Sequence, residues 1–297
     1  MSIIGFIGLG NMGLPMATNL VSAGHQVNAF DQIETACIAA KEAGINICAS
    51  NADTVRDAEF IVTMLPNGPI VLSVFEEIVP AAAKGTIIID CSTVDVSSSK
   101  KAHEMASESG LGCLDAPVSG GIGGATAGTL TFMVGGESQV FEKSQPVLDV
   151  MGAKTVHCGN GGSGQSAKIC NNMLLGISMI GAGEAFALAE KLGLDQNALF
   201  DVISTSSGFC WSVNTYCPVP GVGPQSPADN NYQPGFAGAL MLKDLLLSQQ
   251  AADETGAATP MGQKATQFYQ QFVDDGFGDT DFSGAINALK AMERNSQ

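Results

Sequence analysis

The first half of the chain alternates short apolar runs with stretches whose apolar residues recur at helical spacing. Strands are predicted where the apolar runs fall, at residues 3–7, 26–30, 45–48, 60–65, 86–90, 113–117, 130–134 and 155–158. Amphipathic helices are predicted between the early strands, at residues 14–23, 34–43 and 70–83. This alternation is typical of a parallel, doubly wound α/β sheet.

The second half has a different pattern. From residue 164 onward no strand is predicted; residues 165–192 form one helical pattern, and further helices are predicted at 196–204, 237–255, 261–274 and 283–293. The glycine-rich run 159–164 suits a hinge. We therefore predict an α/β domain over residues 1–163 and an all-α domain, for substrate binding and oligomerisation, over residues 164–297. The Pro-rich stretch 217–234 is predicted to be an ordered functional loop.

Composition narrows the possible partners. A length of 297 residues fits two domains, and 13 Lys and Arg against 29 Asp and Glu give a formal net charge of −16. A nucleic-acid backbone would be repelled by this charge. The eight cysteines include no Cys-x-x-Cys pair and are predicted to be buried, reduced thiols. The three histidines are isolated, which disfavours a metal site.

The most apolar stretch, residues 169–189, is interrupted by Asn171, Asn172 and Glu184. It is predicted to be a buried helix of a water-soluble protein and not a membrane span. No signal-peptide or transit-peptide pattern precedes Ile3, so a cytoplasmic or already processed protein is expected.

The segment Gly8-Leu9-Gly10-Asn11-Met12-Gly13 follows the first predicted strand and opens a helix. In such a motif the first glycine makes a tight turn, the second lets backbone approach a pyrophosphate, and the third lets the helix pack on the strand. Asp31 lies 18 residues past Gly13, at the end of the second strand, where a carboxylate can accept hydrogen bonds from both ribose hydroxyls. The context favours a dinucleotide-binding, Rossmann-type domain over a purely structural glycine turn.

Asp31 also bears on the choice of cofactor. Gln32 and Ile33 follow it, and the next basic residue is Lys41. A 2′-phosphate would therefore meet negative charge with nothing to neutralise it. NAD is favoured over NADP.

Two more predicted strands end in polar segments, Met64-Leu65-Pro66-Asn67 and Asp90-Cys91-Ser92-Thr93. Because ligands of open α/β sheets bind at the carboxyl ends of strands, Leu65, Pro66 and Thr93 are expected to line the adenosine and nicotinamide halves of the cofactor. The alternative is an ordinary strand-to-helix turn, with Pro66 as a breaker and Ser92 or Thr93 as a cap.

The segment Asp115-Ala116-Pro117-Val118-Ser119-Gly120-Gly121 ends another strand in a Ser-Gly-Gly turn. Successive amides of Ser119, Gly120 and Gly121 can form a nest for an anion, and the Ser119 hydroxyl adds a donor. A substrate carboxylate would fit there. A flexible loop before the next strand is the alternative.

Lys168 and Asn172 lie four residues apart near the start of the long helix, on one face of an otherwise apolar element. A lysine partly desolvated at a cleft could take a proton from an alcohol while hydride leaves the same carbon. The alternative is a lysine that reaches solvent from a helix end, with an asparagine that caps a nearby group.

Taken together, these segments resemble the β-hydroxyacid dehydrogenase family over the whole chain. Later segments resemble its 3-hydroxyisobutyrate dehydrogenase branch more specifically. The segments that carry the resemblance are Gly8 to Gly24 with Met16, Asn19 and Leu20, Asp115 to Gly121, Gly128 to Thr131, Lys168 to Leu175, Ser206-Ser207-Gly208, Cys210-Trp211-Ser212, Tyr216, Pro218 to Gly221, Asn230-Asn231-Tyr232 and Lys243-Asp244-Leu245.

The resemblance implies oxidation of 3-hydroxyisobutyrate to methylmalonate semialdehyde in valine breakdown, by hydride transfer to NAD. It implies Lys168 as the acid/base residue, carboxylate binding by Ser119-Gly120-Gly121 with Asn172 nearby, and Lys243 near the nicotinamide. It also implies a homo-oligomer, a dimer or a tetramer.

Two alternatives remain open. A related enzyme, such as a tartronate semialdehyde or glyoxylate reductase, would share Lys168 and the Ser-Gly-Gly turn but act on a more polar substrate. Trp211 is expected to discriminate, by helping to close a pocket over a methyl-bearing acid, although a lone tryptophan is more often a core residue. A non-catalytic dinucleotide-binding scaffold is the other alternative, and the intact set of Lys168, Asn172 and Ser119 counts against it.

Overall fold

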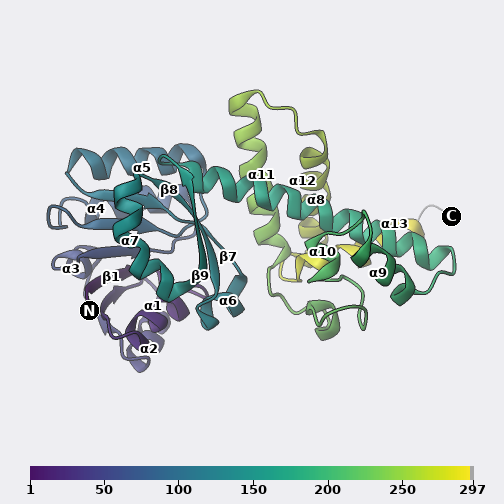
Figure 1. The fold of residues 1–297 in the computed structure, drawn as a ribbon, viewed down its shortest axis with the longest axis horizontal. Helices are drawn as coiled ribbons and strands as arrows, with labels where there is room; N and C mark the ends of the chain where they lie inside the picture. The colour runs from purple at the N-terminus through teal and green to yellow at the C-terminus, as the bar shows by residue number, and fades with distance from the viewer. Residues whose placement is uncertain (295–297) are drawn as a thin grey trace. The chain divides into compact units, whose positions relative to one another are not determined.

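The computed structural model describes residues 1–294. It divides into two compact units, Met1–Lys168 and Ile169–Gln297. Figure 1 shows a unit built on a sheet and a unit built from helices. The predicted fold class, a doubly wound sheet followed by an all-α part, is confirmed. The predicted boundary between residues 163 and 164 stays a prediction.

A single sheet organises the first unit. Its order is β3-β2-β1-β4-β5-β6-β8-β7, with β9 paired to β8. Neighbouring strands from β3 to β6 run parallel, whereas β8 pairs antiparallel with both β6 and β7. The strands are β1 Ile3–Ile7, β2 Gln26–Phe30, β3 Asn46–Ile47, β4 Phe60–Thr63, β5 Ile87–Asp90, β6 Gly112–Asp115, β7 Val118–Ser119, β8 Leu130–Gly136 and β9 Gly152–Gly159.

Helices cover both faces of this sheet (Figure 1). One face packs on α1 Gly13–Ser22, α2 Glu34–Glu42, α6 Gly121–Ala127 and α7 Ser138–Met151. The other face packs on α3 Asn51–Val55, α4 Gly68–Ile78 and α5 Val96–Glu108.

The central strands β1, β4 and β5 are largely apolar because both of their faces are covered. Phe6 and Ile89 lie in the core on one face, and their neighbours Ile7 and Ile88 lie in the core on the other. Successive side chains of a strand point to opposite faces, so a run without polar residues fills both cores. Each such fully buried side chain contributes about 1.5 to 3 kcal/mol.

One predicted strand is interrupted. The run 113–117 was predicted as a single strand, but β6 ends at Asp115. Pro117 has no N–H to donate to a neighbouring strand, and it separates β6 from the short β7. Val118 and Ser119 then pair antiparallel with Phe132 and Thr131 of β8. The sheet is therefore mixed and not wholly parallel.

The second unit is helical in its described residues. Its core joins Met179, Met241, Leu245, Tyr269 and Phe272. Its elements are most of α8 Ser163–Lys191, then α9 Gln196–Thr205, α10 Trp211–Asn214, η1 Pro227–Asn230, α11 Gly238–Thr255, α12 Pro260–Phe272, η2 Val273–Phe277, η3 Phe282–Gly284 and α13 Ala285–Arg294.

The pattern at 165–192 predicted one long helix, and helix α8 has its first residues in the unit Met1–Lys168 and the rest in Ile169–Gln297. Within the described residues it is the one helix with the length and hydropathy of a membrane span, and 44% of its most apolar window is buried. The core helices of water-soluble proteins meet the same criteria, so this is weak support for a membrane span.

The cysteine prediction was partly wrong. All eight thiols are free, and Cys91, Cys113 and Cys217 are buried as predicted, but Cys170 on α8 is exposed. The remaining four, Cys37, Cys48, Cys158 and Cys210, are half-buried. Burial raises the pKa of the Cys91 and Cys113 thiols well above the ordinary range, so these two stay protonated.

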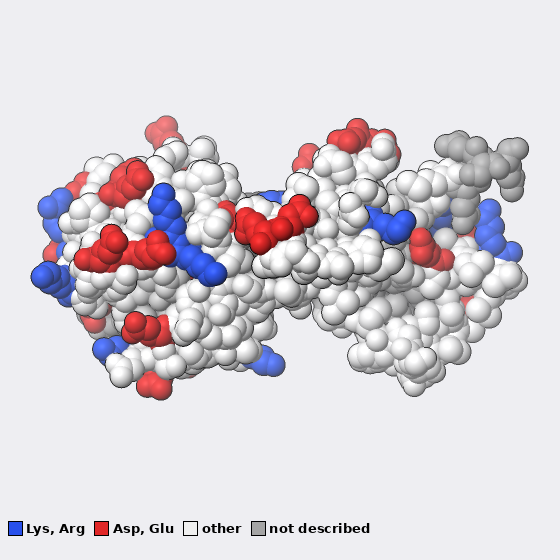
Figure 2. Space-filling view, turned by 90° about the horizontal axis from the view of Figure 1, so that it is seen from above, with Lys and Arg blue, Asp and Glu red and all other residues white. Residues whose placement is uncertain are grey.

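Charged side chains lie scattered over the face that Figure 2 shows, with large uncharged areas between them. Lys and Arg do not form a continuous stripe on this face.

Candidate active site

The glycine loop after β1 has the geometry that its motif predicts. Gly8 has φ +95°, and a Cβ there would overlap the Met64 carbonyl. A Cβ at Gly13 would overlap the Gly8 carbonyl, whereas Gly10 faces open space. The first and third glycines therefore permit close packing, and the second leaves room for a ligand to approach the backbone.

Asp31 is bound to the same loop. Its Oδ2 accepts a hydrogen bond from the Leu9 N–H at 2.6 Å, and its Oδ1 accepts one from the Ile33 N–H at 2.7 Å. Each carboxylate oxygen keeps a second lone pair for a ribose hydroxyl.

A cavity of about 610 Å³ adjoins this loop and is lined by Leu9, Gly10, Asn11 and residues of α1, α2 and α6. The open space at Gly10, the cavity and the held carboxylate fit a dinucleotide.

The two polar strand ends contact each other. The Leu65 N–H donates to the Ser92 Oγ at 2.8 Å, and the Ser92 hydroxyl donates to the Asp90 Oδ1 at 2.5 Å. The capping alternative was wrong for Ser92 and Thr93, because Asp95 caps α5 by accepting from the Ser98 N–H at 2.7 Å.

Asp90 is a buried acid behind these loops, 2% exposed. Its Oδ1 accepts from the Thr63 hydroxyl at 2.7 Å as well as from Ser92. Its Oδ2 is buried without a hydrogen-bond partner among the described residues. Burial raises the pKa of this carboxyl to about 6, against the opposing effect of its hydrogen bonds.

The Ser-Gly-Gly turn joins β7 to α6. Gly120 has φ +135° and Gly121 has φ +60°, so the turn requires backbone conformations that favour glycine. Ser119 is half-buried at the end of β7. This local geometry is that of a tight, ordered turn and not of a flexible loop.

Lys168 lies directly beside this turn. Its side chain is 6% exposed, and its Nζ donates to the Val118 carbonyl at 2.8 Å. The alternative of a lysine that reaches solvent was therefore wrong. The structure brings together the predicted acid/base residue and the predicted carboxylate-binding turn.

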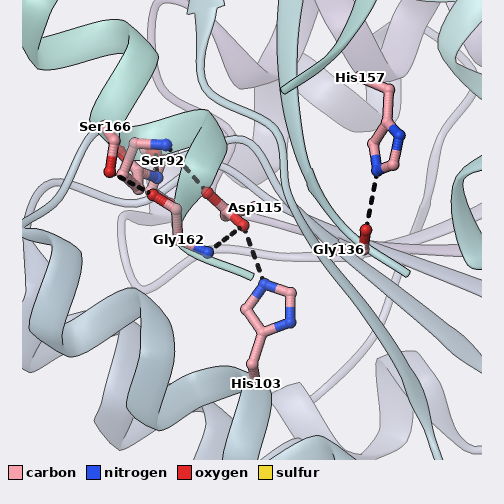
Figure 3. A network of polar contacts seen from close by, with 8 residues as sticks. Ser92, His103, Asp115, Gly136, His157, Gly162 and Ser166 are labelled. Atoms are coloured by element: carbon pink, nitrogen blue, oxygen red, sulfur yellow. Dashed lines mark hydrogen bonds and ion pairs between the residues drawn. The ribbon is translucent and has the colours of Figure 1, made fainter. Parts of the chain in front are cut away.

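The start of α8 is held by two residues whose role the sequence reasoning missed, Asp115 and Gln165. Asp115 accepts hydrogen bonds from the Gly162 and Gln165 N–H groups and contacts His103 (Figure 3). The Gln165 side chain donates to the Ser92 carbonyl and accepts from the Val94 N–H. A charged residue at the end of an apolar strand was the available signal for Asp115.

Asn172, one turn beyond Lys168 on α8, has its partners in the second unit. Its Nδ2 donates to the Asp244 Oδ2 at 2.6 Å, and its Oδ1 accepts from Asn171 at 2.9 Å. Lys243 precedes Asp244 on α11 and is half-buried. Asn172 thus contacts the helix that carries Lys243.

Trp211 begins the short helix α10 and is 47% exposed. Its ring stacks on Tyr216, with centroids 4.8 Å apart and planes 22° apart. The Tyr216 hydroxyl donates to the Asp281 Oδ2 at 3.0 Å. Burial and the Asp281 charge raise the pKa of this phenol, so it stays a donor.

The stretch 217–234 is ordered. Ser226 and Asp229 form a capping box around η1, and the Gly221 N–H donates to the Asp229 Oδ1 at 2.6 Å. Residues 1–294 contain no group of three or more His, Cys, Asp or Glu side chains that could hold a metal ion.

Family models match both parts of the chain. Residues 3–159 match the NAD binding domain of 6-phosphogluconate dehydrogenase. Residues 162–289 match a model described as "NAD-binding of NADP-dependent 3-hydroxyisobutyrate dehydrogenase".

Curated relatives match over nearly the whole length. A probable 3-hydroxyisobutyrate dehydrogenase of Mycobacterium tuberculosis is 47% identical over 98% of this chain and 99% of that protein. The mitochondrial 3-hydroxyisobutyrate dehydrogenase of Rattus norvegicus is 45% identical over 98% and 88% of the two chains. An NAD-dependent L-serine dehydrogenase of Pseudomonas aeruginosa is 43% identical over 95% and 96%.

A solved structure has the same fold. That of Mycobacterium tuberculosis 3-hydroxyisobutyrate dehydrogenase with L-serine superposes with a TM-score of 0.95 at 47% identity, over 98% of this chain and 99% of that one.

Proposed function

This chain belongs to the 3-hydroxyisobutyrate dehydrogenase family of nicotinamide-dependent oxidoreductases, and on this premise we propose that it oxidises 3-hydroxyisobutyrate to methylmalonate semialdehyde in valine breakdown. The observation that carries the proposal is the buried Lys168 beside the Ser119-Gly120-Gly121 turn. A proton acceptor next to an anion-binding turn suits a small acid that carries a hydroxyl group.

Lys168 acts as the general base in this proposal. A nicotinamide cofactor, when bound, would supply the hydride acceptor for the carbon that carries the hydroxyl, and the Gly8–Gly13 loop with Asp31 would hold it. The Lys168 Nζ, in its neutral form, accepts the hydroxyl proton, so that the C–O bond becomes a carbonyl. The Val118 carbonyl at 2.8 Å supports this role because it holds the Nζ beside the turn.

The Ser-Gly-Gly turn binds the substrate carboxylate. Positive φ at Gly120 and Gly121 lets successive N–H groups point to one side, and the Ser119 hydroxyl supplies another donor. Asn172 lies one helical turn from Lys168, which suits a role in orienting the substrate. Trp211 is proposed to contact the substrate acid, and Lys243 is proposed to lie near the nicotinamide.

Cofactor preference is proposed to be NAD over NADP. Asp31 is held between Leu9 and Ile33, and Glu34 follows in the first turn of α2. A 2′-phosphate would meet two acidic side chains there. Leu65, Pro66 and Thr93 are proposed to contact the same cofactor from the ends of β4 and β5.

L-serine is a second candidate substrate. It is favoured by a relative named as an L-serine dehydrogenase and by the solved structure that contains L-serine. L-serine also carries a carboxylate and a terminal hydroxyl, so the same Lys168 and Ser-Gly-Gly turn would serve it. Tartronate semialdehyde and glyoxylate reduction remain alternatives.

Initial rates on a substrate panel test the proposal. Purified protein is assayed with NAD and with NADP against 3-hydroxyisobutyrate, L-serine and 3-hydroxypropionate, and with NADH against tartronate semialdehyde and glyoxylate. The highest kcat/KM is expected for 3-hydroxyisobutyrate with NAD. A higher kcat/KM for L-serine would make L-serine the substrate and would leave the proposed roles of the site residues unchanged.

The methyl ester of 3-hydroxyisobutyrate is the matched control. It keeps the hydroxyl and the methyl group but lacks the charge, so its kcat/KM is expected to fall by about 100-fold or more. Equal use of acid and ester would argue against the carboxylate role of the turn.

A cytoplasmic location remains a prediction, which cell fractionation would test. A homo-oligomer, a dimer or a tetramer, also remains a prediction, which light scattering would test.

A further inference from the structure

A buried carboxylate that takes no part in the proposed proton transfer lies at the end of β6. Asp115 is 2% exposed. Its Oδ1 accepts from the Gly162 N–H at 2.8 Å and lies 2.9 Å from the His103 Nε2, and its Oδ2 accepts from the Gln165 N–H at 2.9 Å. Figure 3 shows the carboxylate between His103 and the segment that opens α8.

One backbone donor, Gly162, directly precedes α8, and the other, Gln165, lies in its first turn. The first N–H groups of a helix have no partner within the helix, so a side chain or water must supply one. Asp115 supplies it from the neighbouring strand, and its charge is favourable at a helix N-terminus. The carboxylate therefore joins the end of β6 to the first turn of α8.

This contact leaves little space for movement. A Cβ at Gly135 of β8 would overlap the Asp115 Oδ1, and a Cβ at Gly164 of α8 would overlap the Asp115 and Met133 carbonyls. The two glycines let β8 and α8 close tightly around the carboxylate. A residue with a side chain at either position would push α8 away from the sheet.

The same segment of the sheet contacts α8 a second time. Val118, three residues after Asp115, accepts from the Lys168 Nζ, and Lys168 lies three residues after Gln165. Two hydrogen bonds thus close a small ring between the strand segment and one turn of the helix. The Ser-Gly-Gly turn begins directly after Val118.

We propose that Asp115 is a positioning residue, which fixes the first turn of α8 and thereby places the Lys168 Nζ beside the Ser-Gly-Gly turn. The proposal rests on the proposed role of Lys168 as the proton acceptor. Gln165 supports the same turn from another side, because its amide joins the Ser92 carbonyl and the Val94 N–H. The position of Lys168 therefore depends on the strand segment 115–118, which binds the α8 backbone through Asp115 and the Lys168 Nζ through Val118.

Asp115→Asn is the direct test. The asparagine side chain has one acceptor oxygen and one NH2 group. At least one of the Gly162 and Gln165 N–H groups therefore faces an NH2 donor in place of a carboxylate oxygen. A displacement of about 1 Å at a catalytic group can lower the rate about 100-fold, and a fall of that size in kcat is expected. The Kd for NAD is expected to change less than 3-fold, and hydrogen exchange at the Gly162 and Gln165 amides is expected to accelerate.

Asp195→Asn is the matched control. Asp195 caps α9 in the same manner, by accepting from the Ala198 N–H at 2.9 Å. Its substitution removes a helix-capping carboxylate without touching α8, so kcat is expected to stay at the wild-type value. A similar fall in kcat in both variants would mean that the loss of a carboxylate charge at any helix N-terminus suffices, and would overturn the proposal.

A double-mutant cycle separates positioning from general support. If Asp115 acts through Lys168, Asp115→Asn lowers kcat about 100-fold in the wild-type background and less than 3-fold in the Lys168→Ala background. An equal fall in both backgrounds overturns the proposal. If Asp115→Asn is insoluble, His103→Ala enters the same cycle, with an expected fall of about 5-fold that also disappears without Lys168.

The cycle also distinguishes the two levels of inference. If Lys168→Ala retains wild-type turnover, the proposed function of the lysine fails. If Lys168→Ala loses turnover while Asp115→Asn keeps it, the positioning role alone is wrong.

Discussion

Each unit contains a buried carboxylate that accepts hydrogen bonds from several backbone N–H groups. The two carboxylates differ in the parts of the chain that they connect. Asp115 joins the end of β6 to the beginning of α8. Asp281 accepts from the Gly235 and Phe236 N–H groups, from Ser283 and from the Tyr216 hydroxyl. The first ties two regular elements together, whereas the second holds a loop and an aromatic side chain.

The difference shows how residues acquire their positions within each unit. In the first unit, parallel strands in register bring their carboxyl ends to one edge, so motifs on successive strands meet without further help. In the second unit, Trp211 depends on its stacking with Tyr216, and Tyr216 contacts an acid 65 residues away. The arrangement in the first unit follows from the repeated pairing of neighbouring parallel strands. The position of Trp211 in the second unit follows from one contact between residues far apart in the sequence.

The largest effect is expected at Lys168, in the first unit. Lys168→Ala removes the proton acceptor, so kcat is expected to fall by about 100-fold to 10,000-fold, while NAD binding stays within about 3-fold of the wild-type value. Steady-state rates and NAD titration measure both. Lys264→Ala, at an exposed lysine, is the control. Near-native turnover of Lys168→Ala would show that another group takes the proton.

The second unit is expected to lose most stability at Asp281. Asp281→Ala leaves several buried donors without an acceptor, at a cost of about 1 to 3 kcal/mol each, so the free energy of unfolding is expected to fall by about 4 kcal/mol or more. Trp211 is the one tryptophan in the chain, so its fluorescence during urea denaturation reports on this unit. The exposed Asp279→Ala is the control, and an equal loss in the two variants would contradict the anchoring role.

A pH-dependent effect is expected at Asp90 in the first unit. Its pKa is about 6 in the folded protein, above the ordinary value of 3.8. Between these two pH values the unfolded chain releases the proton and the folded protein keeps it, so this group lowers the free energy of unfolding as the pH rises. The stabilising contribution of Asp90 begins to fall above about pH 4 and is lost above pH 6.

Asp90→Asn removes this dependence. Relative to wild type, the free energy of unfolding of the variant is expected to rise by about 2 kcal/mol between pH 4 and pH 7, as measured by urea denaturation followed by circular dichroism. Asp57→Asn, at an exposed acid, should show no comparable change. A pH-independent difference for Asp90→Asn would argue that the buried acid is ionised throughout.

A change of cofactor preference is expected from Asp31→Ala combined with Gln32→Arg. The pair removes a carboxylate that repels a 2′-phosphate and adds a bidentate donor for it, so the NAD to NADP ratio of kcat/KM is expected to fall by about 10-fold to 100-fold. Gln32→Arg alone should produce a smaller change. An unchanged ratio would place the ribose somewhere other than at Asp31.

The smallest effect is expected at Trp211. Trp211→Phe keeps an aromatic ring for stacking on Tyr216, so stability should change little, while the relative rates on 3-hydroxyisobutyrate, 3-hydroxypropionate and L-serine shift several-fold. Phe209→Leu, at another exposed aromatic residue nearby, is the control. A sharp loss of stability with constant relative rates would make Trp211 a packing residue.

Much of the first unit could be predicted because its rules are local. The strand-glycine-helix pattern at Gly8 to Gly13, the acid at Asp31 and the Ser-Gly-Gly turn can each be recognised within a few residues, and the structure has them in the expected elements. The interruption at Pro117 was missed, because a run of apolar residues does not show where the pairing of one strand ends and that of another begins.

By itself, the sequence determined the order of strands and helices and the change from an α/β pattern to an all-α pattern, because hydrophobic period and turn chemistry act over short spans. It also supplied the side chains that are proposed to bind a nucleotide and to accept a proton. Only the tertiary structure decided which N–H groups donate to Asp115 and Asp281, and that the Lys168 Nζ donates to the Val118 carbonyl. It also decided that Asp90 is buried, which raises the pKa of its carboxyl to about 6. Most of those contacts join residues 45 to 65 positions apart in the sequence. Burial depends on the packing of the whole unit.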